Sequence, residues 1–172
     1  YLHHNLDLLE RYCKEHSWLT VMVIDNGRTL GEHHDSWLTI LPNRNYGGSG
    51  GFTRGLIEQM TAGVNDYFLM MDDDIEIETA ALDRLIALCR HVKNERTMQM
   101  IGGAMLRMDQ PTIQHENTAY GDRARLRPVG RGLDLADAVA LAQNERSHPA
   151  RGRYAAWWFC CIPRAVVQEQ GY

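Results

Sequence analysis

Apolar residues in the first forty positions recur in two different periods. Leu6, Leu9 and Cys13 share one face of a helix predicted over 5–14, since residues three and four apart are neighbours on a helix. A run of β-forming residues over 19–24 predicts a strand that stops at Asp25-Asn26-Gly27. A shorter strand is predicted over 37–41, before Pro42.

The middle of the chain continues the alternation of helices and strands. The glycine-rich segment 45–55 opens a predicted helix, and an apolar strand follows that ends at Met71. A strongly amphipathic helix comes next, and a strand over 98–105 is interrupted by Gly102-Gly103. The two helices present these apolar residues: Phe52, Leu56 and Met60, then Leu82, Leu85, Ile86, Cys89 and Val92.

The stretch 107–153 differs, because it is polar and rich in arginine, with one weakly helical patch over 133–142. We expect a loop or an insertion there rather than a core layer. An apolar run over 154–162 re-enters the core, and Pro163 starts a last helix that is cut off at Tyr172.

This order of elements predicts an α/β fold in one domain over 1–172, with an open, mostly parallel sheet and helices on both faces. Ligands of such sheets bind beyond the carboxyl ends of the strands. Asp25-Asn26-Gly27, the segment 45–51 and the aspartates Asp72-Asp73-Asp74 all fall at such positions.

The three adjacent aspartates are the strongest indication of chemistry in the sequence, because burying an unpaired charge in a core costs several kcal/mol of free energy. If the strand continues through them, Asp72 and Asp74 share one face and Asp73 faces away. Two converging carboxylates suit Mg²⁺ or Mn²⁺ bound together with substrate phosphates. An acidic turn that caps the next helix is the structural alternative. An Asp-x-Asp phosphatase is disfavoured, because Glu76 stands where such enzymes carry Thr or Val.

The glycine-rich turn offers a second binding feature, since glycines let the backbone and the helix N–H groups approach an anion. No Gly-Lys-Ser/Thr follows, which excludes a P-loop, and Thr53 breaks the dinucleotide fingerprint that starts at Gly48. A close contact between helix and sheet is the structural alternative.

Composition is that of a globular protein of 172 residues, with 44% hydrophobic and 23% charged residues. The net charge of -4 gives no support for nucleic-acid binding. The four cysteines have no zinc-site spacing, and we expect reduced core thiols of a cytoplasmic protein. No segment reaches the roughly 18–20 apolar residues of a membrane span. The start at Tyr1 predicts a piece of a longer protein.

With these motifs in order, the chain resembles the family-2 nucleotide-sugar glycosyltransferases of GT-A fold, and among them the galactofuranosyltransferases that build cell-wall galactan. The resemblance covers nearly the whole chain. It is carried by these segments: Val23-Ile24-Asp25-Asn26-Gly27, Asn43 through Gly55, Met71-Asp72-Asp73-Asp74-Ile75 and Ala156-Trp157-Trp158-Phe159.

The resemblance implies roles for individual residues on the donor side. Asp25 matches the position that accepts a hydrogen bond from the uracil imide, and its alternative role is an Asx-turn. Arg54 matches a position near the nucleotide, with a surface ion pair as the alternative. Asn45 with Gly47 and Gly48 would line the donor pocket, Asp73 would contact the donor sugar or solvent, and Asp72 and Asp74 match the metal-binding pair.

On the acceptor side, the resemblance implies that Glu116, Trp157 and Trp158 bind the acceptor, with only one tryptophan touching it if the two lie in a strand. His115 is expected to be an ordinary loop residue. The family's first strand would precede Tyr1, and its catalytic base and a further metal-binding His would follow Tyr172, so the fragment alone is expected to be inactive.

The implied function is an inverting, metal-dependent transfer from a UDP-sugar, with UDP-galactofuranose favoured, to a glycan or glycolipid acceptor. The expected location is the cytoplasm, including the inner face of the cell membrane; peripheral membrane association and homo-oligomerisation of the full protein are compatible with the sequence. The alternatives are a sugar nucleotidyltransferase of similar fold and a non-catalytic nucleotide- or glycan-binding module.

Overall fold

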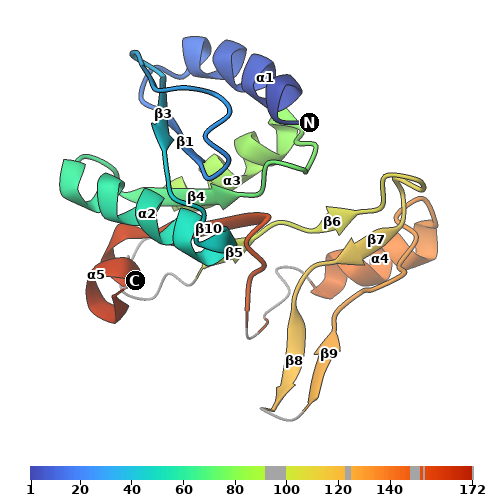
Figure 1. Ribbon diagram of the computed structural model, residues 1–172. Helices are drawn as coiled ribbons and strands as arrows, with labels where there is room; N and C mark the ends of the chain where they lie inside the picture. Colours follow the sequence, from blue (N-terminus) through green and yellow to red (C-terminus); the bar gives the residue numbers. More distant parts are fainter. Residues whose placement is uncertain (92–99, 123–124, 148–151, 153, 172) are drawn as a thin grey trace. The chain divides into compact units, whose positions relative to one another are not determined.

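The computed structural model describes residues 1–91, 100–122, 125–147, 152 and 154–171 (Figure 1). The chain divides into two compact units. The first comprises Tyr1–Phe68, Asp73–Met98 and Pro163–Tyr172, and the second comprises Leu69–Asp72 and Gln99–Ile162. The predicted helical position Val92 and the strand start at Met98 lie outside the described residues.

Helices and strands alternate in the first half of the chain, as predicted. The elements of the first unit are α1 (Leu2–Glu15), β1 (Val21–Asp25), β2 (His33–His34), β3 (Leu38–Pro42), α2 (Gly47–Ala62), α3 (Thr79–His91) and α5 (Arg164–Gln170), and β4 (Tyr67–Met71) leads from this unit into the second. Within the first unit β1 pairs in parallel with β3, from Val21 opposite Leu38 to Asp25 opposite Pro42. The short edge strand β2, which the sequence did not predict, pairs antiparallel with β3.

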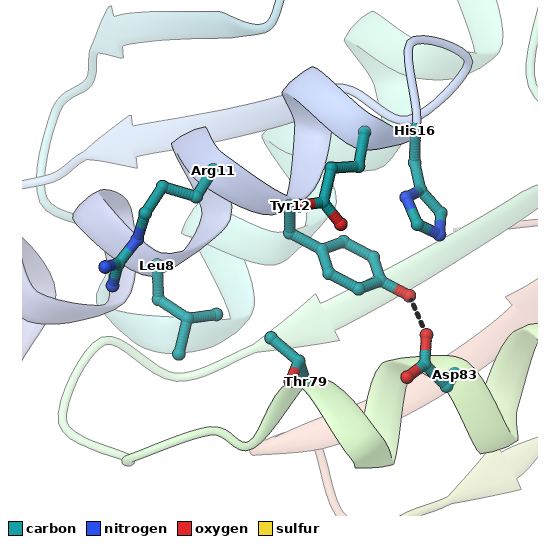
Figure 2. Close-up of a pocket in the computed structure, with 7 residues that line it drawn as sticks. Leu8, Arg11, Tyr12, His16, Thr79 and Asp83 are labelled. Atoms are coloured by element: carbon teal, nitrogen blue, oxygen red, sulfur yellow. Dashed lines mark hydrogen bonds between the residues drawn. The ribbon is translucent and has the colours of Figure 1, made fainter.

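Helix α1 buries Leu9 and Cys13 of its predicted apolar face, whereas Leu6 is half-buried. Asn5, Leu9, Tyr12 and Cys13 are its buried residues, spaced as one helical face. The Tyr12 hydroxyl donates to Asp83 Oδ1 of α3 at 2.6 Å (Figure 2). Asn5 Nδ2 donates to the carbonyl of Ile75 at 2.6 Å. Burial and the Asp83 carboxylate raise the pKa of Tyr12, so its hydroxyl stays a donor.

Helix α2 ends at Ala62 and is capped by Gly63, whose φ of 76° is the left-handed conformation usual after a helix. Arg164, the first residue of α5, donates to the carbonyls of Met60 at 2.8 Å and Asn65 at 3.1 Å. A cation that satisfies the last carbonyls of a helix also opposes its negative dipole end. Arg164 therefore ties α5 to the end of α2 within the first unit.

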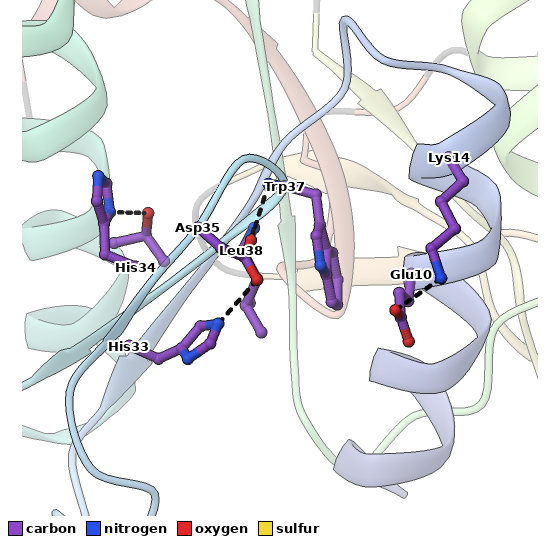
Figure 3. Close-up of polar contacts among 8 residues, drawn as sticks. Glu10, Lys14, His33, His34, Asp35, Trp37 and Leu38 are labelled. Carbon is purple, nitrogen blue, oxygen red and sulfur yellow. Dashed lines mark hydrogen bonds and ion pairs between the residues drawn. The ribbon is translucent and has the colours of Figure 1, made fainter.

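The turn between β2 and β3 is held by Asp35. Its Oδ1 accepts the N–H groups of Trp37 and Leu38, and its Oδ2 pairs with His33 Nε2 at 2.9 Å (Figure 3). These contacts, the His33 bond first, lower the pKa of the Asp35 carboxyl to about 2. On the exposed side of α1, Glu10 and Lys14 form an ion pair of a kind that contributes little to stability.

In the second unit, β10 (Phe159–Pro163) lies between β4 and β5 (Ile101–Gly102). Cys160 and Cys161 of β10 are 0% and 1% exposed, and Cys13 of α1 is also buried, so three of the four cysteines are core residues as expected. Burial raises the pKa of the Cys160 thiol to about 11. Cys89 is half-buried instead.

Gly102 and Gly103 of the second unit have no side chains, which lets Ala155, before β10, and Phe159, the first residue of β10, lie close to them. A Cβ at Gly102 would lie 2.9 Å from Ala155 Cβ, and one at Gly103 would lie 2.7 Å from the Phe159 ring. The break that Gly102-Gly103 predicted in the strand is present, since β5 ends at Gly102 and β6 (Met105–Leu106) begins three residues later.

The segment expected to be a loop or an insertion contains regular structure. Strand β6 pairs with β7 (Gln114–Glu116), and β8 (Ala119–Asp122) forms a hairpin with β9 (Arg125–Pro128), drawn side by side in Figure 1. Helix α4 (Ala138–Ser147) overlaps the end of the predicted helical patch. Polar hairpins held by cross-strand pairing leave little hydrophobic period in the sequence, which explains why they were not predicted.

The mixed α/β class is confirmed, but an open, mostly parallel sheet is not. Strands β1 and β3 form a parallel pair, whereas β2–β3, β5–β10, β6–β7 and β8–β9 are antiparallel. The sheets have two or three strands each within the described part. No helix among the described residues has the length and apolarity needed to cross a bilayer.

We predict that NMR titration of the Asp35 carboxyl gives a midpoint of about 2, against its ordinary 3.8. Because the folded pKa is the lower one, the stabilisation is complete above about pH 4 and is lost as the pH falls through about 2. The variant His33→Ala should move the midpoint toward 3.8, since the His33 bond is the largest cause of the shift. An unchanged midpoint in His33→Ala would contradict this assignment.

Candidate functional site

The end of β1 is fixed by the side chain of Asp25. Asp25 is 6% exposed, its Oδ1 accepts the N–H of Gly27 at 3.1 Å, and its Oδ2 accepts the N–H of Leu30 at 2.8 Å. The first contact is the Asx-turn foreseen as the alternative role. A carboxylate has about four acceptor positions, so these bonds leave capacity for one from a base. The uracil contact of Asp25 stays a prediction.

Asn26 joins three segments of the first unit. Its Oδ1 accepts from Asn43 Nδ2 at 2.9 Å, and its Nδ2 donates to the carbonyl of Gly47 at 3.3 Å. Asn26 follows β1, Asn43 follows β3, and Gly47 opens α2, so one amide connects the carboxyl ends of both strands to the start of the helix. We call these contacts the Asn26 bridge. The sequence contained both asparagines in its motifs, but gave no reason to pair them.

The loop after Asn26 is held in an uncommon conformation. Arg28 has a φ of 54°, which is rare for a residue other than glycine. Its backbone N–H donates to the carbonyl of Asp25 at 3.3 Å, and its Nε donates to the carbonyl of Asn43 at 3.1 Å. The ends of β1 and β3 are thus linked by the Asn26 bridge, by Arg28 and by the N–H of Asn43, which donates to the carbonyl of Asp25 at 2.9 Å.

The glycine-rich turn opens α2, as predicted, and its glycines have different tasks. Gly47 has a φ of 75°, and its N–H donates to Asn45 Oδ1 at 2.9 Å. A Cβ at Gly51 would lie 2.9 Å from Asn26 Nδ2, whereas a Cβ at Gly48 would meet nothing within 4 Å. The close helix–sheet contact therefore explains Gly51, and packing does not explain Gly48.

The other predicted donor-side residues lie on the surface. Asn45, Gly47, Gly48 and Arg54 are exposed. Arg54 pairs with Glu58 one turn along α2 at 2.6 Å, which is the surface ion pair foreseen as its alternative. A role of Arg54 toward a nucleotide requires that this exposed pair open, at a cost that is small for such pairs.

The aspartates do not continue the strand, so the reason given for their orientation is wrong. Strand β4 ends at Met71, and Asp73 and Asp74 lie in a turn where strand alternation does not apply. Asp72 is half-buried, and Asp73 and Asp74 are exposed. Among the described residues no three His, Cys, Asp or Glu side chains are grouped to hold a metal. The donor set is still two or more carboxylates, which fits a Mg²⁺ or Mn²⁺ that takes further oxygens from phosphates.

The predicted acceptor-side residues all belong to the second unit. Glu116 ends β7, and its Oε1 accepts a hydrogen bond from the Tyr154 hydroxyl. Trp157 and Trp158 lie in a turn before β10 rather than in the strand. Trp157 is 41% exposed, whereas Trp158 is half-buried. Trp157 is therefore more exposed than Trp158, and the strand argument for a difference between them does not apply; which of them touches the acceptor stays a prediction. The sequence missed Tyr154.

A cavity of about 340 Å³ lies between α1 and α3 of the first unit (Figure 2). It is lined by Leu8, Arg11, Tyr12, Glu15, His16, Thr79 and Asp83. None of the residues predicted to bind donor, metal or acceptor belongs to this lining. The sequence motifs for nucleotide or sugar binding therefore do not point to this cavity.

We predict that Gly51→Ala lowers stability by about 1–2 kcal/mol, because its methyl group would displace the Asn26 amide from both partners. Thermal unfolding measures the loss. Gly55→Ala is the matched control on the same helix, since its Cβ would lie 3.5 Å from Ile24 Cγ1, an ordinary contact. Equal melting temperatures for the two variants would contradict the importance of the Asn26 bridge.

Comparison with known proteins finds relatives that match most of this chain. The chain is 31% identical over 170 residues to the Galactofuranosyltransferase GlfT2 of Mycobacterium tuberculosis. It is 29% identical over 171 residues to the Galactofuranosyltransferase GlfT2 of Mycolicibacterium smegmatis. Each match covers 88% of this chain but only 26% of the relative, so the chain spans a minor part of their length. No family model matches the chain. The two similarities support a relationship to glycosyltransferases.

Proposed function

We propose that this chain is the nucleotide-sugar-binding part of a metal-dependent, inverting glycosyltransferase of family 2 with a GT-A fold. The proposed donor is UDP-galactofuranose and the proposed acceptor is a glycan or glycolipid of the cell wall. The observation that carries the proposal is the similarity over 88% of the chain to two proteins named galactofuranosyltransferases. The arrangement of polar groups in the first unit supports it.

The donor's nucleotide is assigned to the ends of β1 and β3 and the start of α2. Within the first unit, the Asn26 bridge and Arg28 link the ends of the two strands and the start of the helix. Asp25 would read the uracil with its remaining acceptor capacity, and Asn45, Gly47, Gly48, Arg54 and Asp73 would contact the nucleotide sugar. Carboxyl ends of strands beside a helix N-terminus suit a nucleotide diphosphate, since backbone N–H groups there lack partners.

The divalent cation is assigned to Asp72 and Asp74. Bound Mg²⁺ or Mn²⁺ would neutralise the charge that develops on a departing diphosphate. The turn after β4 leaves Asp73 and Asp74 exposed to a ligand, and Asp72 half-buried at the strand end. The acceptor is assigned to Glu116, Trp157 and Trp158, because a carboxylate accepts from sugar hydroxyls and an exposed indole stacks on sugar C–H groups.

The proposed GT-A fold requires more sheet than the described residues contain. In the described part β1 is hydrogen-bonded to β3 alone, so its other edge is open to a further strand. Four of the five residues of β1 are half-buried apolar side chains, as in a strand meant for the interior of a sheet. The general base would lie in sequence beyond Tyr172, in keeping with relatives far longer than this chain.

Transfer by the full-length protein is the direct test. We expect it to move galactofuranose from UDP-galactofuranose to an octyl digalactofuranoside, releasing UDP, and to require Mg²⁺ or Mn²⁺. Chromatography of the extended glycan measures this. Binding of UDP without any turnover would favour the non-catalytic module instead. Formation of a sugar nucleotide from UTP and a sugar phosphate would favour a nucleotidyltransferase.

Calorimetry of UDP binding to the full-length protein tests the metal assignment. We predict that Mn²⁺ tightens UDP binding about tenfold or more, a usual size for coupling between two ligands. Asp74→Asn should abolish this effect, because it removes one anionic ligand. Asp73→Asn, next to it in the same exposed turn, is the matched control and should retain the effect. A metal effect that survives in Asp74→Asn, or that is lost equally in both, would overturn the assignment.

A further inference from the structure

Tyr154 has two contacts with the same short segment of the second unit. Its hydroxyl donates to Glu116 Oε1, at the end of β7. Its carbonyl accepts from Thr118 Oγ1 at 2.6 Å. The side chain and the backbone of one residue are therefore both tied to the segment 116–118.

Thr118 is a firm anchor for this contact. It is 6% exposed, and its own carbonyl accepts the N–H of Val129 at 2.8 Å. The chain that leads to Tyr154 passes close by, since a Cβ at Gly152 would lie 1.6 Å from Thr118 Oγ1. No other residue fits at Gly152 without a shift of the backbone or of Thr118. The approach of the two chain segments is thus fixed at Gly152 as well as at Tyr154.

The direction of the hydroxyl bond follows from its chemistry. The hydrogen bond to Glu116 and burial together raise the pKa of Tyr154, so the phenol stays protonated and donates a hydrogen bond to the carboxylate. Glu116 then acts as an acceptor through Oε1. Among the described residues, the structure gives Glu116 Oε2 no hydrogen-bond donor, so this oxygen can accept from a ligand hydroxyl.

We propose that Tyr154 is a positioning residue for the acceptor sugar. It orients the Glu116 carboxylate so that Oε2 accepts a sugar hydroxyl, and its backbone contact with Thr118 anchors the segment that leads to the turn with Trp157. Trp157, 41% exposed and three residues after Tyr154, supplies the aromatic face for the sugar ring. This inference rests on the proposed function and deepens it, since it identifies a residue that neither the sequence motifs nor the proposed site contains.

Steady-state kinetics of the full-length protein with UDP-galactofuranose and an octyl digalactofuranoside test the proposal. Tyr154→Phe removes the hydroxyl that donates to Glu116, and we expect the acceptor KM to rise about tenfold, as for loss of a hydrogen bond to a charged group. The donor KM should stay within about twofold. Glu116→Gln should raise the acceptor KM as well, and the double variant should be little worse than Glu116→Gln, because the two residues act as one unit.

Tyr12→Phe is the matched control. It removes the same hydroxyl from a tyrosine–carboxylate pair, Tyr12 with Asp83, in the first unit. Its acceptor KM should equal that of the parent, even if both tyrosine variants melt at a similarly lowered temperature. An unchanged acceptor KM in Tyr154→Phe, or losses that simply add in the double variant, would overturn the proposal. Donor and acceptor KM values that rise together would overturn it too, because they indicate a structural role.

Binding separates this inference from the proposed function. Tryptophan fluorescence is followed while the octyl digalactofuranoside is added without donor. A parent protein that binds this glycan but transfers nothing, with about tenfold weaker binding in Tyr154→Phe, would support the positioning role and contradict the transferase. A parent that neither binds nor transfers would overturn both.

Discussion

The first unit depends on how the polar backbone at the ends of β1 and β3 is satisfied. Two parallel strands that stop side by side leave N–H and carbonyl groups without ladder partners, and such groups are costly when buried. Asp25 satisfies two of these N–H groups with one carboxylate, and the Asn26 bridge fixes Asn43 and Gly47 with one amide. Together with Arg28, which donates to the carbonyl of Asn43, these short side chains hold the loop after β1 and the start of α2. The proposed donor site consists of those same segments.

This dependence means that several residues have a structural task whether or not they bind a ligand. Asp25 forms an Asx-turn, Gly51 leaves space for Asn26, and Arg54 pairs with Glu58. Loss of activity in variants of these residues therefore does not by itself identify a ligand contact. Gly48 differs from Gly51, because a methyl group there would meet nothing within 4 Å. A glycine without a packing reason is more informative about an approaching ligand than one with a packing reason.

The sequence predicted the helices and the central strands well, because their apolar faces repeat with a clear period. The face of α1 at Leu9 and Cys13, and the helix that opens at Gly47, are found where expected. The hairpins of 105–128 were missed, because partners of a short polar strand are chosen by turns and cross-strand contacts rather than by periodicity. The sequence named candidate site residues, but it did not predict the hydrogen bonds among them. Neither the pairing of Asn26 with Asn43 nor that of Tyr154 with Glu116 leaves a pattern in the sequence, since the partners are far apart in the chain.

The central claim is that the ends of β1 and β3 and the start of α2 form the nucleotide site. Hydrogen–deuterium exchange of the full-length protein, with and without UDP and Mn²⁺, tests it most directly. The account predicts slower exchange of the amides in 25–30 and 43–51, because a ligand there would cover the N–H groups at the helix start and stabilise the loop after β1. Protection confined to α1 and the start of α3, around the cavity at Tyr12 and Asp83, would contradict it.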